Sequence, residues 1–510
     1  MRFILTVSFF LYCIPHANAQ VNILPFQHNS NLNLERKIYE YQIVNHPSVH
    51  QWVVQFSDDT LRELDHERWQ KRRYEKWIGR KLWNEDLISI DTSNFSLRIN
   101  PLVNFQVGSD LSDTSNQTLS TNSRGILVEG AVGKKFSFYT SVWENQSFFP
   151  NYLSNYVNAN RVVPGQGRTK PFKKTGFDYA RASAVLYYQP KKWLNIQAGH
   201  GKNFYGNGYR SILLSDFAFN YPYLKVGVSL FGGKLLYQPS IASLQELMRL
   251  PATGAAEAQF QRKAGTFHIL NFQPNSKLEI GLFEGGVWQN WDTNGTMKLP
   301  VTFYIPILFM NSGINGLQSN NYKGVVGINV RLNPIKKLAL YTQVALSEGN
   351  GSRLGSQFGA KWFDAFKLEN LFFQAEYNTV ENGLYSNLNS GFDYSHYNEG
   401  LGNFSLQGTE EFVARINYSW HDVFFRFKYN NQKRTVGITK TSGAISVVSN
   451  VSQNVSIASF ELGYLLNPAN NMMLLLGMQQ RNLEISAITN ESQWFYLAFR
   501  TELQNLYFDF

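Results

Sequence analysis

Apolar and polar residues alternate along most of the chain from Phe95 onward, which is the pattern of β-strands. One face of the first such segment carries the apolar residues Phe95, Leu97, Ile99, Val103, Phe105 and Val107. The alternation returns at 412–419 and at 423–429, again with charged and amide side chains on the second face. The strands of a soluble β-sandwich also alternate in this way. Here, however, charged and amide side chains repeat on one face, and aromatic residues gather at the ends of the apolar face. This combination favours a transmembrane β-barrel with a polar lumen.

Eight short turns, most of them with Pro or Lys, allow the strands to be counted. They lie at 133–135, 189–192, 232–233, 273–277, 333–337, 364–367, 421–422 and 467–470. Long Asn-, Gly- and Ser-rich connections separate them, as expected for periplasmic turns opposite extracellular loops. Eight hairpins, with one strand before them (about 94–108) and one after (about 492–510), predict an all-β antiparallel barrel of about eighteen strands over residues 92–510.

The first part of the chain has a different character. Arg2, an apolar stretch and then Ala17-Asn18-Ala19 indicate a signal peptide over residues 1–19. Cys13, the only cysteine, lies inside it, so we expect neither a disulfide nor a cysteine metal site in the rest. Residues 20–91 are predicted to form a small, partly helical periplasmic segment, with the helix within 58–84.

Composition narrows the class further. Only 16% of the 510 residues are charged, 15% are aromatic, and mean hydropathy is −0.28. The abundant aromatics exclude a disordered chain, and no apolar stretch of about 18 residues exists for a membrane helix. The ending Tyr507-Phe508-Asp509-Phe510 resembles the signal by which barrel-insertion machinery recognises its substrates. We therefore expect a protein of the bacterial outer membrane.

The connection 146–177 is the first candidate for ligand binding. It contains no acidic residue and carries the cations Arg161, Arg168, Lys170, Lys173 and Lys174. Tyr152 and Tyr156 are interleaved with them. Such cations attract an anionic surface polysaccharide over a Debye length of ~8 Å, and the rings can stack on sugars. The alternative is that the cations pair with lipopolysaccharide phosphates of the outer leaflet. The net charge of +10 suits either interpretation, and nucleic acid is not an expected partner for an exported barrel.

The segment 200–217 is the second candidate. Its Gly206 and Gly208 permit a close approach of the backbone to another group. We add Tyr205, Tyr209 and Arg210 to the candidate ligand-binding residues. The apolar run Ile212, Leu213 and Leu214 is expected to fold inward and to plug the lumen, because such a run is unfavourable in water. A third connection, Ser243–Lys263, predicts either a short helix over the barrel mouth, broken at Pro251, or an ordinary loop.

Enzyme chemistry has little support in the sequence. The barrel part contains four histidines, and only His200 with Asp216 could be drawn as a catalytic dyad. No nucleophile motif accompanies them, and no metal-ligand spacing is present. We therefore predict no catalytic site, metal or cofactor, and interpret these histidines as structural.

Several short motifs resemble the Wzi capsule-assembly family, in particular its gliding-motility-associated (RemB-type) relatives. They are Asn122-Ser123-Arg124-Gly125, Gly133-Lys134-Lys135, Phe149-Pro150-Asn151-Tyr152, Val163-Pro164-Gly165-Gln166-Gly167, 177–183 and Ser211-Ile212-Leu213-Leu214-Ser215. The resemblance is dense over about 85–230. It implies an eighteen-stranded outer-membrane barrel with a periplasmic helical part, acting as a surface lectin for capsular polysaccharide.

Three functions stay open at this point. The protein binds or helps assemble surface polysaccharide, or it belongs to a gliding-motility or adhesion apparatus with motility or secretion components as partners, or it is a substrate channel. Because gliding-associated relatives need not make a capsule, the resemblance does not decide between the first two.

Overall fold

A computed structural model of the chain describes residues 21–23, 25–50, 53–55, 76–114, 117–250, 259–292, 295–349, 351–387, 390–442, 445–485, 488–502 and 504–510. The predicted signal peptide and most of the helix predicted within 58–84 lie outside the described residues. The end of that predicted helix is present as α3 (Trp77–Trp83).

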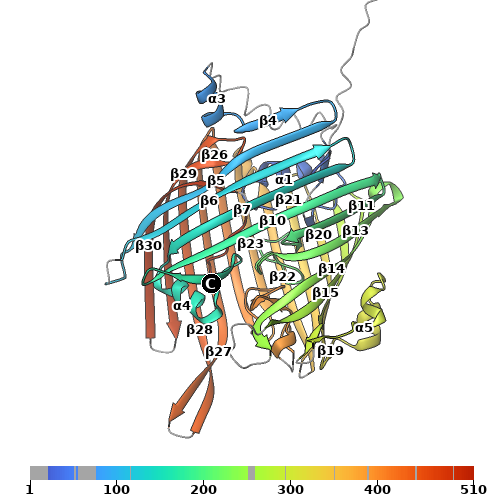
Figure 1. Cartoon of the computed structure of the whole chain (residues 1–510), viewed down its shortest axis with the longest axis vertical. Coiled ribbons are helices and arrows are strands. Elements are labelled where there is room, and N and C mark those ends of the chain that lie inside the picture. Colours follow the sequence, from blue (N-terminus) through green and yellow to red (C-terminus); the bar gives the residue numbers. More distant parts are fainter. Residues whose placement is uncertain are drawn as a thin grey trace, which may run out of the picture.

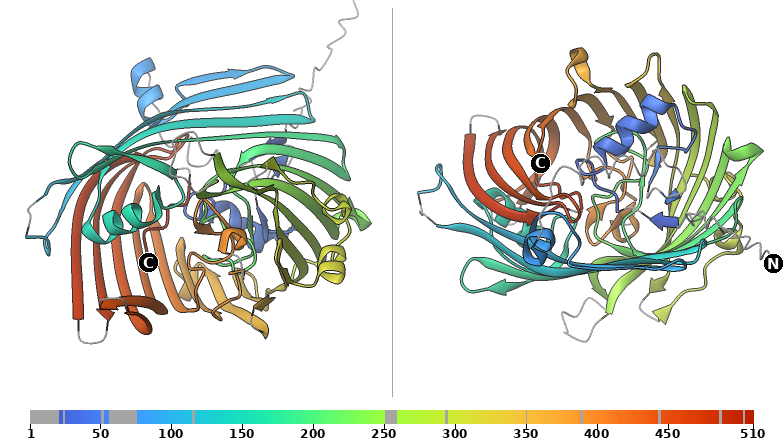
Figure 2. Two further views of the ribbon diagram at one scale, coloured as in Figure 1. Left: turned by 60° about the horizontal axis from the view of Figure 1, so that its bottom comes forward. Right: turned by 90° about the horizontal axis from the view of Figure 1, so that it is seen from above.

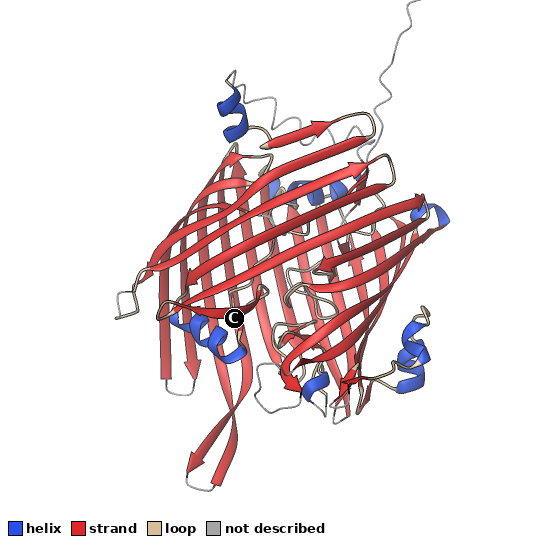
Figure 3. Cartoon of the chain, viewed as in Figure 1, coloured by secondary structure: helices blue, strands red, loops and turns tan. Residues whose placement is uncertain are grey.

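Eighteen long antiparallel strands form a closed barrel, which confirms the predicted class and strand number (Figures 1 and 3). Each strand pairs with its neighbours in order, and the last pairs with the first between 494–500 and 104–110. The strands are β5 (Phe95–Asp110), β6 (Leu119–Val132), β7 (Phe136–Phe148), β10 (Gly176–Lys191), β11 (Leu194–Gly201), β13 (Tyr221–Leu230), β14 (Leu235–Leu250), β15 (Gln259–Asn275), β16 (Leu278–Gln289), β20 (Tyr322–Leu332), β21 (Leu338–Gly349), β22 (Gly351–Phe363), β23 (Leu371–Val380), β26 (Thr409–Trp420), β27 (Val423–Ser442), β28 (Ile445–Asn467), β29 (Met472–Ile485) and β30 (Ile488–Thr501).

The wall of the barrel has its polar side chains inside and its apolar side chains outside. Fully buried polar residues on the inner face include Glu279, Asn329, Gln343, Gln357, Gln374, Glu376 and Glu411. Large apolar residues on the same strands are exposed on the outer face, among them Ile280, Ile328, Leu340, Phe358, Tyr377 and Phe412. This arrangement is the reverse of a soluble protein and is the one that a lipid-embedded barrel requires.

The eight predicted short turns all join consecutive strands at one end of the barrel, which is the periplasmic end by the asymmetry of such barrels. Helix α3 and strand β4 (Ile88–Asp91), which pairs with β5, lie at this end (Figure 1). The prediction that all opposite connections are long is wrong, because β21–β22, β27–β28 and β29–β30 meet in tight hairpins. Strands β27 and β28, of 20 and 23 residues, form one long hairpin there.

The predicted last strand, about 492–510, is shorter than the sequence suggested. Strand β30 ends at Thr501, and β4 rather than β30 pairs with residues 96–99 of β5. Residues 504–510 turn into the barrel, where Tyr507, Phe508 and Phe510 pack against interior aromatic rings. The aromatic ending that resembled an insertion signal is therefore not part of the terminal strand.

Four segments occupy the lumen (Figure 2). They are residues 25–50 with α1 (Leu32–Tyr41), the connection 202–220, the described residues of the connection 381–408 and the segment 504–510. Short strands tie two of these segments together, because β2 (Val49–His50) pairs with β12 (Phe204–Tyr205). Further short pairs are β1 (Val21–Ile23) with β3 (Val53–Gln55), β17 (Trp291–Asp292) with β18 (Gly295–Thr296), and β24 (Ser395–His396) with β25 (Glu399–Gly400).

Ion pairs fasten the first of these segments to the wall. Glu35 of α1 lies 2.7 Å from the Nζ of Lys361 on β22. Ser48 donates a hydrogen bond to Glu279, which also pairs with Arg331 at 2.8 Å. Residues 25–50 of the predicted segment 20–91 are thus held inside the periplasmic mouth of the barrel, whereas α3 and β4 lie at its rim.

Helices are few and lie at the rims or in the lumen. Besides α1 and α3 they are α4 (Asn151–Asn160) and α5 (Met310–Asn315), with 3₁₀ turns at Phe231–Gly233, Val301–Tyr304, Ala365–Lys367 and Ser390–Phe392. No helix of the described residues is long and apolar enough to cross a membrane. The helix predicted within 243–263 is wrong where the structure describes it, because both flanks continue as strands β14 and β15; residues 251–258 lie outside the described residues.

At some glycines of the wall, a lumen segment packs directly against the strand backbone. A Cβ added to Gly327 of β20 would lie 2.3 Å from Leu213 and 2.4 Å from the backbone oxygen of Val344. Both distances are far below van der Waals contact, and Leu213 is fully buried. The connection 202–220 can therefore sit this close only because the wall lacks a side chain at this position.

We expect the Gly327→Ala variant to be destabilised by about 1–3 kcal/mol, because the added methyl group overpacks the contact with Leu213. The measurement is urea or thermal unfolding of the folded barrel in detergent. Gly313→Ala is the control, since an added Cβ there has nothing within 4 Å. Equal stabilities of the two variants would show that the connection 202–220 does not press against β20.

Candidate functional site

The cation-rich connection between β7 and β10 is ordered at the extracellular rim. Helix α4 begins it, and β8 (Val162–Val163) and β9 (Gly167–Phe172) follow as a small hairpin. Strand β9 also pairs with residues 176–179 of β10. The cations of this connection are thereby placed on a sheet rather than on a free loop.

Strand β9 lies beside the extracellular end of β10, in a stretch of β10 that β11 does not reach. Strands β11 and β13 are short, so β11 pairs with β10 only as far as 184 and β13 pairs with β14 only as far as 242. The exposed edge of β14 beyond 242 is bonded instead by the connection 381–408: Tyr397 donates its N–H to the carbonyl oxygen of Gln245, and Leu247 donates its N–H to Asn398. A gap in the regular sheet therefore faces the extracellular side between β10 and β14.

A cleft of about 620 Å³ occupies this place. Five cations line it: Arg161, Arg168, Lys170, Lys174 and Arg249. The described residues of its lining contain no carboxylate but include the amides Gln117, Asn151, Asn155 and Asn158. The guanidinium groups of Arg168 and Arg249 each lie 4.6 Å from the ring centre of Phe260. We call this the rim cleft.

Four of the five cations predicted in the connection thus meet in the rim cleft, and the fifth does not. Lys173 has a positive φ of 53° in the turn between β9 and β10, and its Nζ lies over the rings of Phe148 and Phe172. Its positive charge is therefore presented beside the cleft rather than within its lining.

The sequence did not identify Arg249 and Phe260, because they belong to the region that was predicted as a helix. As parts of β14 and β15 they approach the cations of the other connection from across the gap. The residues 243–250 and 259–263 show no regular alternation of apolar and polar side chains, so the sequence held no local signal for these two strand ends.

The tyrosines predicted beside these cations face the interior. Tyr152 donates its hydroxyl to the carbonyl oxygen of Phe508 at 3.0 Å and accepts a hydrogen bond from Gln479. The ring of Tyr156 lies 4.5 Å from that of Phe510. Burial raises the pKa of Tyr152 to about 12. Both rings fasten α4 to the segment 504–510, so neither is presented to a ligand in the rim cleft.

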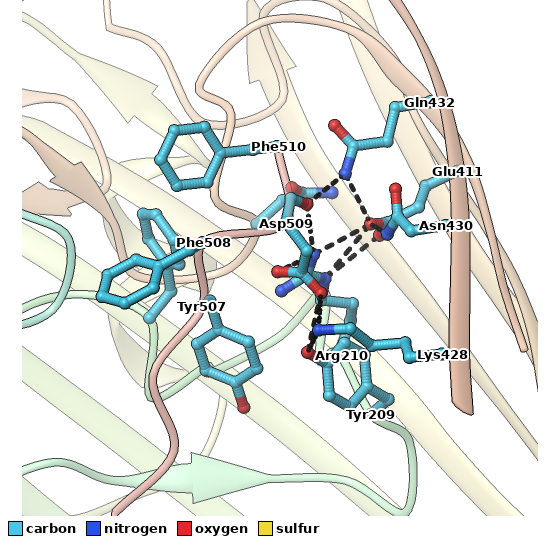
Figure 4. Close-up of polar contacts among 12 residues, drawn as sticks. Tyr209, Arg210, Glu411, Lys428, Asn430, Gln432, Tyr507, Phe508, Asp509 and Phe510 are labelled. Atoms are coloured by element: carbon cyan, nitrogen blue, oxygen red, sulfur yellow. Dashed lines mark hydrogen bonds and ion pairs between the residues drawn. The ribbon is translucent and has the colours of Figure 1, made fainter. Parts of the chain in front are cut away.

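Tyr205, Tyr209 and Arg210, also predicted as ligand-binding residues, are buried in the lumen with partners from the chain itself. Figure 4 shows the contacts of Tyr209 and Arg210. The Nη2 of Arg210 lies 3.0 Å from Glu411 and 3.1 Å from Asp509. Tyr209 donates its hydroxyl to Asp509 at 2.7 Å. These contacts lock the segments together, and we leave the three residues out of the proposed ligand site.

The cations around Asp509 explain why the pKa of its carboxyl group is low. Burial alone would raise its pKa, but Arg210 and Lys428, which lies 2.8 Å away, outweigh burial and lower the pKa to about 2. Asn430 and Gln432 of β27 donate hydrogen bonds to Glu411, and Gln432 also donates to the backbone oxygen of Asp509. Paired in this way, the buried charges join two lumen segments, 202–220 and 504–510, to the wall.

A second buried cluster joins the connections to one another. Lys202 donates its Nζ to the backbone oxygen of Asp216 at 2.8 Å, and Glu399 accepts the N–H groups of Gly165 and Phe219. Burial lowers the pKa of Lys202 and raises the pKa of Glu399. Asp216 accepts the hydroxyl of Tyr507 at 2.8 Å.

The predicted plug residues lie deep in the lumen. Ile212, Leu213 and Leu214 are almost fully buried in a cluster with aromatic and aliphatic residues of the wall and of the connection 381–408. Tyr385 and Tyr394 donate their hydroxyls to the carbonyl oxygens of Ile212 and Leu213. Apolar side chains here fill space that water would occupy in an open channel.

The structure brings together no catalytic group that the sequence considered. His200 bonds through Nδ1 to the carbonyl oxygen of Ala182, whereas the carboxylate of Asp216 accepts hydrogen bonds from Asn505 and Tyr507. Within the described ranges, no three His, Cys, Asp or Glu side chains are grouped so that they could hold a metal ion.

Comparisons with known proteins concern the fold. No family model matches the chain, and no curated protein matches its sequence. The chain is similar to Wzi, a carbohydrate-binding β-barrel involved in group 1 capsule assembly in Escherichia coli. The identity is 9% and the TM-score 0.54, over 95% of this chain and 100% of that chain. Acinetobacter baumannii OccAB2 matches at 10% identity and a TM-score of 0.43, over 80% of this chain and 97% of that chain.

The first of these likenesses shows a shared barrel fold. Together with the closed wall and its apolar outer face, it confirms a bacterial outer-membrane barrel. The barrel fold that the resemblance to the Wzi family implied is therefore present. The finer resemblance to the gliding-associated relatives stays a prediction.

We expect Asp509→Asn to lower the free energy of unfolding by about 2–3 kcal/mol at neutral pH, because the depressed pKa of Asp509 reports its attraction to Arg210 and Lys428. A depressed carboxyl pKa stabilises the fold above the unfolded value of about 3.9 and loses its effect as the pH falls through about 2. The difference between wild type and variant should therefore shrink between about pH 4 and pH 2 in unfolding experiments. Exposed Asp178→Asn is the control, and a difference that does not change with pH would contradict the assignment.

Proposed function

We propose that this protein binds an anionic surface polysaccharide in the rim cleft at the outer face of the bacterial outer membrane. One observation carries the proposal: four cations of the connection 146–177 and Arg249 of β14 line one extracellular cleft whose described lining contains no carboxylate. The four cations of the connection 146–177 form no ion pair with a carboxylate of the described residues, so they keep their attraction for an external polyanion.

The chemistry of the lining favours a glycan chain as the ligand. Amide side chains of α4 and Gln117 can exchange hydrogen bonds with sugar hydroxyls, and the guanidinium groups and ammonium groups can bind carboxylates or sulfates. Ring stacking contributes little, because Tyr152 and Tyr156 face inward and Phe260 already lies beside two guanidinium groups. Recognition therefore rests on charge and amide hydrogen bonds.

The fold supports the same proposal from a second direction. The Escherichia coli protein Wzi, which shares the fold, is a carbohydrate-binding barrel involved in capsule assembly. At 9% identity the likeness transfers no residue, so the rim cleft has to carry the proposal by its own chemistry.

Binding of the purified barrel to polygalacturonate tests the proposal. The triple variant Arg168→Gln, Lys170→Gln and Lys174→Gln should bind about tenfold or more weakly, because each exposed charge pair contributes about 0.2–1 kcal/mol. Wild-type binding should weaken as salt rises, and neutral dextran should not bind. The matched control changes Lys134, Lys135 and Lys192 of the periplasmic turns to Gln.

Retention of polygalacturonate by the triple variant at wild-type strength would reject the proposal. A variant that keeps polygalacturonate binding but loses lipopolysaccharide would reassign the cleft to the phosphates of the outer leaflet.

The third candidate function, a substrate channel, makes a contrasting prediction. The connections 202–220 and 381–408 fill the lumen with buried side chains, so we expect no stepwise conductance in planar lipid bilayers. Regular open-channel steps from the wild-type protein would favour the channel instead.

A further inference from the structure

We infer a second binding site, inside the barrel, that accepts a single sugar bearing a carboxylate. It is a chamber of about 220 Å³ between the segment 504–508 and the wall formed by β5–β7 and β26–β30. We call it the inner chamber. The inference does not rest on the proposed function, because the two sites have no charged residue in common.

Arg181 of β10 is the key residue of the inner chamber. Its side chain is buried, with 6% of the residue exposed, and its guanidinium lies 4.6 Å from the ring centre of Trp143. Nη1 donates a hydrogen bond to Gln504 at 2.6 Å, whereas Nε has no hydrogen-bond partner among the described residues. No described carboxylate pairs with this cation. A buried guanidinium without a counter-charge is costly, and a bound anion would remove that cost.

The other cations of the inner chamber differ in how they are compensated. Arg426 and Arg500 both pair with Glu461 and Glu502, at distances from 2.7 to 3.7 Å. Among the described residues Arg415, like Arg181, donates side-chain hydrogen bonds only to amide oxygens, here those of Gln374 and Asn29. Two buried positive charges therefore face one chamber without carboxylate partners in the described part of the chain.

The neutral lining suits the hydroxyl groups of a sugar. Trp494 Nε1, Arg500 Nε and Asn104 Oδ1 are buried and have no hydrogen-bond partner among the described residues. Gln106, Thr121 and Ser123 add further donors and acceptors on the adjacent strands. The volume of about 220 Å³ is enough for one sugar ring. A planar carboxylate can take two hydrogen bonds from one guanidinium.

Access to the inner chamber is from the periplasmic end. A second cavity, of about 100 Å³, shares Asn29, Asn417, Arg426 and Glu502 with it. That cavity is also lined by the periplasmic turn residues Asp364, His421 and Asp422. At the opposite end Phe149 and Phe508 bound the inner chamber beneath α4. The ligand therefore enters from the periplasm, whereas the rim cleft faces the cell exterior.

Titration of the purified full-length barrel with glucuronate tests the inference. We expect wild-type binding in the millimolar range, followed by isothermal titration or ligand-observed NMR, with glucose and lactate at least tenfold weaker. Arg181→Gln should weaken glucuronate binding at least tenfold. Lys225→Gln is the matched control, because Lys225 is a buried inner-face cation that does not line the chamber and should bind glucuronate as the wild type does.

A second variant keeps the test decisive if Arg181→Gln fails to fold, which heat-dependent electrophoretic mobility reports. Asn104→Asp adds a negative charge to the inner chamber and should also repel glucuronate. The inference is overturned if the wild type does not bind glucuronate, if glucose or lactate binds equally well, or if the folded chamber variants bind like the control. The triple variant of the rim cleft should retain glucuronate binding, so failure of one site is distinguishable from failure of the other.

Discussion

The ion pairs of Arg210 inside the barrel are the interaction on which the rest of the structure depends. A barrel wall with a polar inner face leaves buried carboxylates such as Glu411 that need partners, since an unpaired buried charge costs several kcal/mol. Arg210 supplies a partner to Glu411 and simultaneously binds Asp509, so one guanidinium joins the wall to two lumen segments. The filled lumen follows from satisfying these charges.

This pairing separates the charges that stabilise the fold from those that can bind ligands. Arg331, Lys361 and Arg210 each have a carboxylate within 3.1 Å and serve the fold. The four rim-cleft cations of the connection 146–177 and Arg181 have none within the described ranges. With a net charge of +10, the chain has more cations than its own carboxylates can compensate, and the structure collects several of the excess in two places.

The sequence predicted what depends on neighbouring residues. Alternation gave the outward-facing residues such as Phe105 and Phe412, and turn chemistry gave all eight periplasmic turns and the eighteen strands. It missed contacts between residues far apart. Arg210 meets partners 201 and 299 residues away, and no local pattern reports such a pairing. For the same reason the aromatic ending was assigned to a strand, although its ion pair with Arg210 draws it into the lumen.

Hydrogen–deuterium exchange of the folded barrel in detergent tests the central claim most directly. If buried ion pairs hold the connection 202–220 in the lumen, the amides of Tyr209 to Leu214 should exchange as slowly as those of the wall strand β23. Exchange of these amides within seconds, at the rate of an exposed loop, would contradict a lumen filled and locked by paired charges.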